Sequence, residues 1–196
     1  MRVQFVRNDH GAGYAVLILR EDGVTVRLPG NDRTFRVPHD LAHLVAEREF
    51  RLARGVFGCI AAGAMFTNMA LVGGRTRYDA WARSRAVLRA NAAELGLAEC
   101  LSGVVHDAVE YELEAGAAYR RLRESWGVLR PEPCPYRPAD LRRAVDVLDE
   151  LGRRWRTVGP GERLALRWTM PAGPVPVSRS DRRPATARRA RAVASR

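Results

Sequence analysis

The stretch RVPHDLAHLVAERE, residues 36–49, carries the side chains of this chain that are best suited to chemistry. His39, His43 and Glu47 follow one another at intervals of four residues, and Asp40 directly follows the first histidine. On a helix, residues four apart leave the same face one turn apart, so two histidines and a carboxylate could bind one metal ion. Asp40 would then be placed to move a proton, although an acid in the first turn is also stabilised by the helix dipole.

A second histidine–acid pair occurs in HDAVE, residues 106–110. His106 and Glu110 are also four apart, and both fall away from the apolar stripe of their segment. Two facing helices with such pairs could enclose a Zn²⁺ or Fe(II) ion, whereas histidines that only cap and pair locally would form an ordinary polar face. The predicted site has metal ligands on both segments and two acids as catalytic groups: His39, His43, Glu47 and His106, with Asp40 and Glu110.

The five residues HDLAH, 39–43, resemble the HExxH motif of the zincin metallopeptidases. Asp40 stands at the position of that family's glutamate base and is one methylene shorter. The resemblance implies that His39 and His43 are zinc ligands and that Asp40 is the base.

The order of histidines and acids along the chain is also similar to that of HD-domain phosphohydrolases. The residues concerned are His39 or His43, the pair His106–Asp107, and a later acid such as Asp146. That family is entirely helical, so this resemblance implies a different fold from the one that the strand patterns below predict.

A third resemblance covers most of the chain and concerns the order of its segments. An N-terminal β-meander is followed by HDLAHLVAE, by the Gly-rich apolar segment GVFGCIAAG, by helices and by a closing GPGERLALRW. This order resembles an uncharacterised bacterial family of hypothetical proteins, in which we expect an HDLxHxxxE helix after the meander. No activity is assigned to that family, so the resemblance implies a one-domain fold and no particular reaction.

The first 37 residues have the patterns of β-strands. VQFV alternates, YAVLIL is a continuous apolar run, and VTVRL places three apolar side chains on one face, with turn-forming residues between these segments. TFRV, residues 34–37, extends the pattern, so we expect a meander of three or four antiparallel strands. LALRWTM, residues 164–170, alternates in the same way and is predicted to join that sheet.

The middle of the chain has helical periodicity. Pro38 is suited to the first turn of a helix that runs to about Arg54. Further helices are expected over 56–66, over 77–95 with Trp81 on the apolar stripe, from Ala98 with a break near Gly116, and from Pro138 to about Trp155. The predicted fold class is therefore α+β: an N-terminal antiparallel meander, joined by a C-terminal strand and packed against a bundle of about five helices.

The charge of the chain is concentrated at its C-terminal end. All 33 basic residues are arginine, a bias typical of GC-rich genomes, so the formal net charge of +11 is only a weak indication of nucleic-acid binding. Residues 176–196 contain seven arginines against one acid and have no apolar period. We expect residues 1–175 to form a single domain and 176–196 to be a disordered tail, which either only keeps the chain soluble or makes weak electrostatic contact with nucleic acid or acidic surfaces.

The cysteines and the apolar runs indicate the cellular compartment that we expect for the protein. Cys59, Cys100 and Cys134 are odd in number and irregularly spaced, which favours reduced thiols in a cytoplasm. The N-terminus has no apolar signal region. The 20 uncharged residues 55–74 are long enough to cross a bilayer, but they contain five glycines, so we expect a buried core helix and no membrane span.

Two classes of function follow from these patterns. The first is a small cytoplasmic metal-binding protein, with a metal-dependent hydrolase as its more specific form, using the helix of His39, His43 and Glu47. The second is a non-enzymatic interaction module with a basic tail. The substrate and the partner are not indicated by any motif in the sequence.

Overall fold

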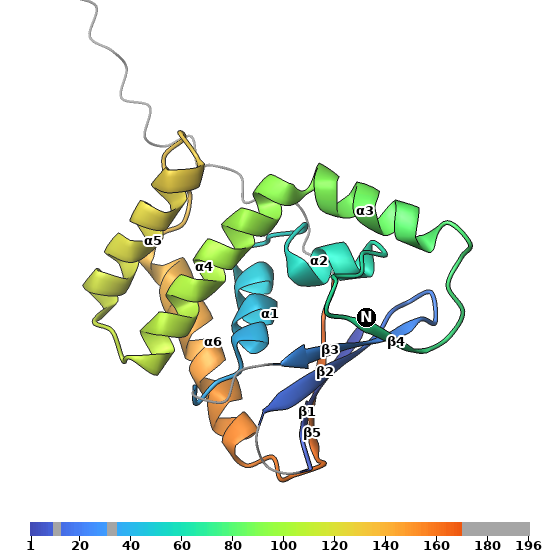
Figure 1. The fold of residues 1–196 in the computed structure, drawn as a ribbon. Helices are drawn as coiled ribbons and strands as arrows, with labels where there is room; N and C mark the ends of the chain where they lie inside the picture. The colour runs from blue at the N-terminus through green and yellow to red at the C-terminus, as the bar shows by residue number, and fades with distance from the viewer. Residues whose placement is uncertain (10–12, 31–34, 170–196) are drawn as a thin grey trace, which may run out of the picture.

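The protein has the predicted α+β architecture in a computed structural model that describes residues 1–9, 13–30 and 35–169 (Figure 1). Within these residues, five strands form one antiparallel sheet in the order β4-β3-β2-β1-β5. The predicted C-terminal strand is confirmed, because β5 pairs antiparallel with β1 and places Leu164 opposite Phe5. The strands are β1 (Arg2–Arg7), β2 (Tyr14–Leu19), β3 (Thr25–Gly30), β4 (Ala70–Gly73) and β5 (Arg163–Arg167).

Alternation along the strands puts apolar side chains on the core face of the sheet. Val3 of β1 lies opposite Ile18 of β2, which lies opposite Val26 of β3, and all three side chains are fully buried. Phe5 and Val16 form the next buried pair. Such rows of cross-strand neighbours fix the register, since a slip of one residue would turn every one of them toward solvent.

The fourth strand predicted from TFRV is not formed over residues 35–37, the described part of that segment. The backbone of Val37 is bonded to a helix instead: its N–H donates to the Glu110 carboxylate at 2.7 Å, and its carbonyl lies 2.9 Å from Nε2 of His106. The edge position beside β3 is taken by β4, which comes from the Gly-rich segment and pairs with Thr25 to Arg27.

Six helices occur in the described residues, one more than the periodicity predicts. The start of the last helix at Pro138 is confirmed, and its first turn is capped by the Asp140 carboxylate, which accepts from the Arg137 N–H at 2.9 Å. The helices are α1 (His39–Glu49), α2 (Val56–Ala61), α3 (Ala80–Ala90), α4 (Ala92–Glu110), α5 (Ala115–Leu129) and α6 (Pro138–Arg156).

Helix α1 ends earlier than predicted, at Glu49 in place of about Arg54. Arg51 adopts a left-handed conformation, with φ of 56°, and the Leu52 N–H then returns to the Glu47 carbonyl at 2.8 Å. This turn closes α1 in the manner of a left-handed helix cap and redirects the chain toward α2. The predicted helix 56–66 is likewise shortened to α2, and Gly63 follows it at φ 100°.

Helix α3 departs furthest from the prediction. The apolar spacing around Trp81 suggested a core-facing helix over 77–95, but α3 covers only 80–90 and the Trp81 side chain is 60% exposed. The next helix begins at Ala92, six residues before the predicted Ala98, because α3 and α4 are separated only by Asn91.

Helix α1 is the central helix of the fold. It contacts α4, α6 and α2, and every residue from Leu41 to Glu47 is buried, on the polar face as well as on the apolar one (Figure 1). The two polar side chains in this stretch, His43 and Glu47, therefore lie inside the protein, where each of them needs a partner.

The uncharged stretch 55–74 contains α2 and β4, separated by a turn. No helix within the described ranges combines the length and the apolar character needed to cross a bilayer. Residues 170–196 lie outside the described residues, so the predicted tail at 176–196 and the last residues of the predicted domain 1–175 stay predictions.

Candidate metal centre

The polar residues of α1 face α4, the helix that carries the second histidine–acid pair. The two helices run antiparallel: Val37, just before α1, is bonded to His106 and Glu110, whereas His43, one turn into α1, meets Ser102 and Glu99. The polar stripe of α4 thus extends from Glu99 to Glu110 with spacings of three and four residues, which keep it on one helix face.

Three of these side chains place metal-ligating atoms close together. One ligand atom from each of His39, His43 and Glu99 can be chosen so that all three lie within 4.8 Å of one another. Nε2 of His43 is 3.0 Å from one carboxylate oxygen of Glu99, and Nε2 of His39 is 4.0 Å from the other. His43 is 3% exposed whereas the Glu99 side chain is 63% exposed, so the cluster reaches from the interior to the surface.

The protonation states of the cluster suit a cation. Burial, reinforced by the neighbouring His43, lowers the pKa of His39, so its imidazole is neutral at neutral pH. The hydrogen bond from His43 lowers the pKa of Glu99 and keeps its carboxylate ionised. Neutral imidazole and ionised carboxylate are the forms that bind metal ions.

Ser102 orients the ring of His43. Its hydroxyl donates to the Ala98 carbonyl at 2.6 Å, and its oxygen lies 3.2 Å from Nδ1 of His43. The same oxygen lies 3.3 Å from Nε2, so Ser102 packs against the edge of the ring between both nitrogens. Without an ion, Nε2 donates to the Glu99 carboxylate at 3.0 Å, and this proton would have to leave before Nε2 could bind a metal.

Glu47, the third residue of the HDLAHLVAE pattern, lies on the other side of His43. Its carboxylate accepts the N–H groups of Phe57 at 3.0 Å and of Gly58 at 3.1 Å, in the first turn of α2. A Cβ at Gly55 would lie 2.4 Å from this carboxyl carbon, so only glycine fits there. Both oxygens are therefore used to begin α2, and Glu47 is not one of the three clustered ligands.

Asp40 is turned toward the sheet. Its Oδ2 accepts a hydrogen bond of 2.7 Å from the hydroxyl of Tyr14 on β2, and burial raises the pKa of its carboxyl. His39 and His43 act in the opposite direction and favour its ionised form. Asp40 is thus a half-buried carboxyl whose pKa responds to both histidines.

His106 and Glu110 together hold the chain at the start of α1. They bind the carbonyl and the N–H of the same residue, Val37, and Glu110 also pairs with Arg36 at 3.6 Å. The ring of His106 lies beside that of His39, with centroids 5.3 Å apart. The predicted ligand His106 and the predicted acid Glu110 thus border the cluster and position the helix that carries it.

Two residues of the HD-domain pattern lie apart from the cluster. Asp107 pairs with Arg121 on the surface at 3.2 Å, and Asp146 lies on α6 near Tyr119 and Arg142. Neither acid belongs to the group of clustered ligands in the described part of the chain.

The sequence motifs missed Glu99 as a ligand. Its signal is its position seven residues before His106, two turns earlier on the same face of α4, but no motif marks such a spacing. Comparison of the chain with protein-family models, with curated proteins and with solved structures finds no match.

Proposed function

We propose that the protein binds a divalent metal ion through His39, His43 and Glu99. The observation that supports this most strongly is the convergence of the three ligand atoms within 4.8 Å. Two of the residues come from one helix and the third from the helix packed against it, so the fold itself brings them together.

The separations are compatible with coordination. Ligands about 2.1 Å from a tetrahedral Zn²⁺ lie about 3.4 Å from one another, and small side-chain rotations would bring the cluster to that spacing. The exposed Glu99 side chain is free to make such an adjustment. Two histidines and one carboxylate are found both in catalytic zinc sites and in non-haem Fe(II) sites, which leaves Zn²⁺ and Fe(II) as the two candidate ions.

A metal-dependent hydrolase is the specific activity that this site would support. Three protein ligands leave a coordination position for water, and a bound ion supplies Lewis acidity and lowers the pKa of such a water. Our candidate for taking up a proton is Asp40, which follows His39 in the chain and accepts a hydrogen bond from the Tyr14 hydroxyl. Glu110 is less suited to that role, since its carboxylate is bonded to the Val37 N–H.

The test is a titration of chelator-treated protein with Zn²⁺ and with Fe(II) under anaerobic conditions, followed by calorimetry. We expect one saturable site in the natural protein and an affinity at least about tenfold lower in His39→Ala and in Glu99→Gln, since each removes a ligand. Glu150→Gln is the matched control: Glu150 is similarly exposed and pairs with Arg153 on α6. An unchanged affinity in both ligand variants would contradict the proposal.

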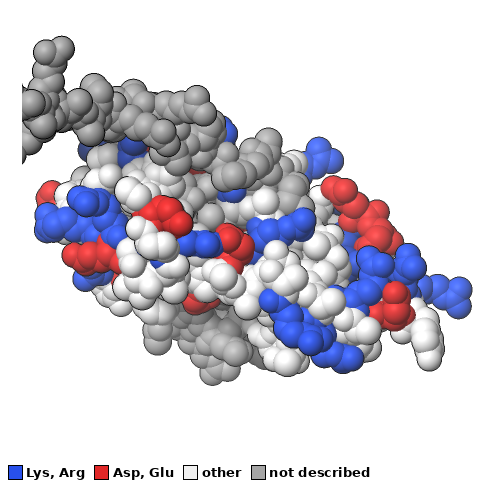
Figure 2. Space-filling model, turned by 90° about the horizontal axis from the view of Figure 1, so that it is seen from above, with Lys and Arg blue, Asp and Glu red and all other residues white. Residues whose placement is uncertain are grey.

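A non-enzymatic interaction module is the second candidate, and a group of exposed apolar side chains favours it. Tyr78 is fully exposed, Trp81 and Val72 are more than half exposed, and all three come from β4, from α3 or from the segment between them. On the face seen in Figure 2, arginines and carboxylates are interspersed, so that view shows no uniformly basic surface for nucleic acid. If Trp81→Ala abolished binding to a partner protein and left metal binding unchanged, that result would support this second function.

A further inference from the structure

A cavity of about 380 Å³ lies between the turn after β2, the end of α2 and the start of α3. It is separate in its residues from the histidine cluster, and its polar lining is mainly guanidinium. The charged residues that line it are four arginines and two acids: Arg20, Arg75, Arg77 and Arg83, with Glu21 and Asp22.

The two acids do not balance the four arginines within the cavity. Asp22 is bound to Arg20, which donates from Nε at 3.1 Å and also from Nη2. Glu21 extends to the N-terminal ammonium group at 3.1 Å. Arg77 has a longer pairing of 3.4 Å with Asp79, whereas Arg83 forms no ion pair with the described residues.

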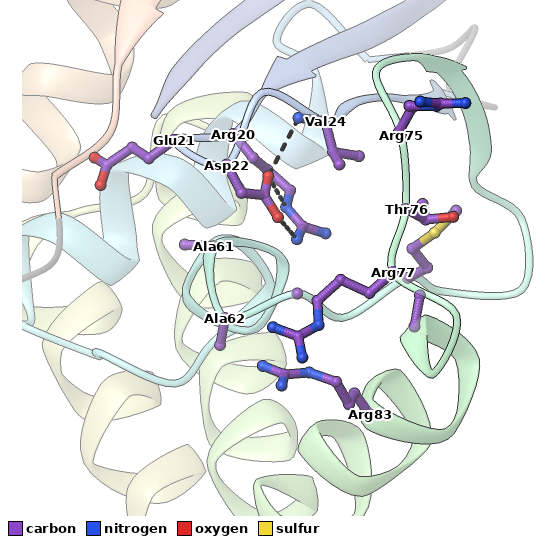
Figure 3. A pocket seen from close by; sticks show the side chains of 13 residues that line it. Arg20, Glu21, Asp22, Val24, Ala61, Ala62, Arg75, Thr76, Arg77 and Arg83 are labelled. Atoms are coloured by element: carbon purple, nitrogen blue, oxygen red, sulfur yellow. Dashed lines mark hydrogen bonds and ion pairs between the residues drawn. The ribbon is translucent and has the colours of Figure 1, made fainter.

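The arginine side chains converge although they come from three different segments. In Figure 3 the guanidinium groups of Arg20, Arg77 and Arg83 point toward the same space, whereas the Arg75 side chain, at the edge of the cavity, extends away from them. Like charges brought together near a protein surface repel one another. An anion with several oxygens would relieve this repulsion, because guanidinium groups bind carboxylate and phosphate oxygens through paired hydrogen bonds.

The walls of the cavity are fixed by buried contacts. The Ser84 hydroxyl, next to Arg83, accepts from the Met65 N–H at 2.9 Å and donates to its carbonyl at 3.1 Å, which ties α3 to the segment after α2. Gly63, at φ 100°, lets that segment pass close to Arg20: a Cβ there would lie 3.4 Å from Nη2. These contacts fix the backbone that carries Arg83 and the wall beside Arg20, whose side chain is bound to Asp22, and this reduces part of the cost of binding.

We infer that this cavity binds the phosphate group of a small phosphorylated molecule. The cavity volume lies in the range of small-molecule sites, and the remaining wall is apolar, formed by Val24, Ala61, Ala62, Met65 and Ala80. A concave site with apolar walls suits a small ligand with a non-phosphate part better than a nucleic-acid backbone, which is bound along an open basic surface.

The test uses pyrophosphate as the probe and the full chain in the presence of EDTA, so that the histidine cluster holds no metal. Isothermal titration calorimetry is expected to show one saturable site, with an affinity at least about tenfold lower in the Arg77→Gln, Arg83→Gln double variant. Arg85→Gln is the matched control, because Arg85 is an exposed arginine of α3 that does not line the cavity. Its affinity for pyrophosphate is expected to stay within about twofold of the natural protein.

Three results would overturn the inference. The first is that pyrophosphate shows no saturable binding. The second is that Arg85→Gln weakens binding as much as the double variant does. In the third case a single-stranded DNA oligonucleotide would displace pyrophosphate and bind more tightly, which would make the cavity part of a nucleic-acid surface. Since EDTA is present throughout, none of these results depends on whether the histidine cluster binds metal.

Discussion

Replacement of Glu47 by glutamine separates its structural role from that of a metal ligand. Burial raises the pKa of the Glu47 carboxyl from 4.5 to about 7, against the opposing effect of the N–H groups of α2. The folded protein therefore holds a proton that the unfolded chain releases between these two pH values. Stability from this group is fully present below pH 4.5 and is lost as the pH rises through 7, a change of about 3 kcal/mol.

The assay is urea denaturation of the natural protein and of Glu47→Gln at several pH values between about 4.5 and 8, in EDTA. Glutamine does not titrate, so the natural protein should lose about 3 kcal/mol of stability relative to the variant across this range. At the acidic end, where Glu47 is protonated, the two proteins should differ by less than about 1 kcal/mol, because a protonated carboxyl and an amide each offer one carbonyl acceptor to the N–H groups of Phe57 and Gly58. His43, 4.0 Å away, is present in both proteins.

Parallel pH profiles for the two proteins would refute this reasoning, since they would mean that Glu47 does not titrate differently in the folded state. The same variant is expected to retain the metal affinity of the natural protein, because Glu47 is outside the group of clustered ligands. Loss of metal binding in Glu47→Gln, with the fold intact, would instead restore it as a ligand.

Three further predictions concern the parts of the fold around the site. Glu110→Ala should lower the free energy of unfolding by about 1–3 kcal/mol in urea denaturation, since it leaves the Val37 N–H without its acceptor; a change near zero would contradict this. Tyr136→Phe should cost about 1 kcal/mol in the same assay, because the tyrosine hydroxyl donates to the buried Phe50 carbonyl at 2.9 Å, and an unchanged midpoint would show that this bond contributes nothing. Deletion of residues 176–196 should leave the melting temperature within a few degrees, and a large drop would show that the tail packs on the domain.

The sheet and the last helix could be predicted from local patterns. The alternation in β1 and β5 has a period of two, and Pro38 and Pro138 mark helix starts for a reason that lies in the residue itself. The expected strand is not formed over residues 35–37 because tertiary contacts use its backbone groups. The Val37 backbone is bonded to His106 and Glu110 of a helix about 70 residues away.

The sequence predicts the helix that carries the candidate site, but only two of the three clustered residues, His39 and His43. The four-residue spacing of His39 and His43 places both on one face, and the second histidine–acid pair correctly indicated α4 as the facing helix. Periodicity cannot determine how far one helix is shifted along another, and that shift brings Glu99 to His43 while Glu47 meets the first turn of α2.

The central claim is that one metal ion binds between α1 and α4, and anomalous diffraction from crystals grown with Zn²⁺ tests it most directly. We expect a peak above the zinc absorption edge, about 2.0–2.2 Å from a ring nitrogen of His39, from a ring nitrogen of His43 and from a carboxylate oxygen of Glu99. The peak should vanish below the edge and should be absent from crystals of Glu99→Gln. A well-ordered histidine cluster with no peak at stoichiometric Zn²⁺, or with the only peak elsewhere in the molecule, would contradict the claim.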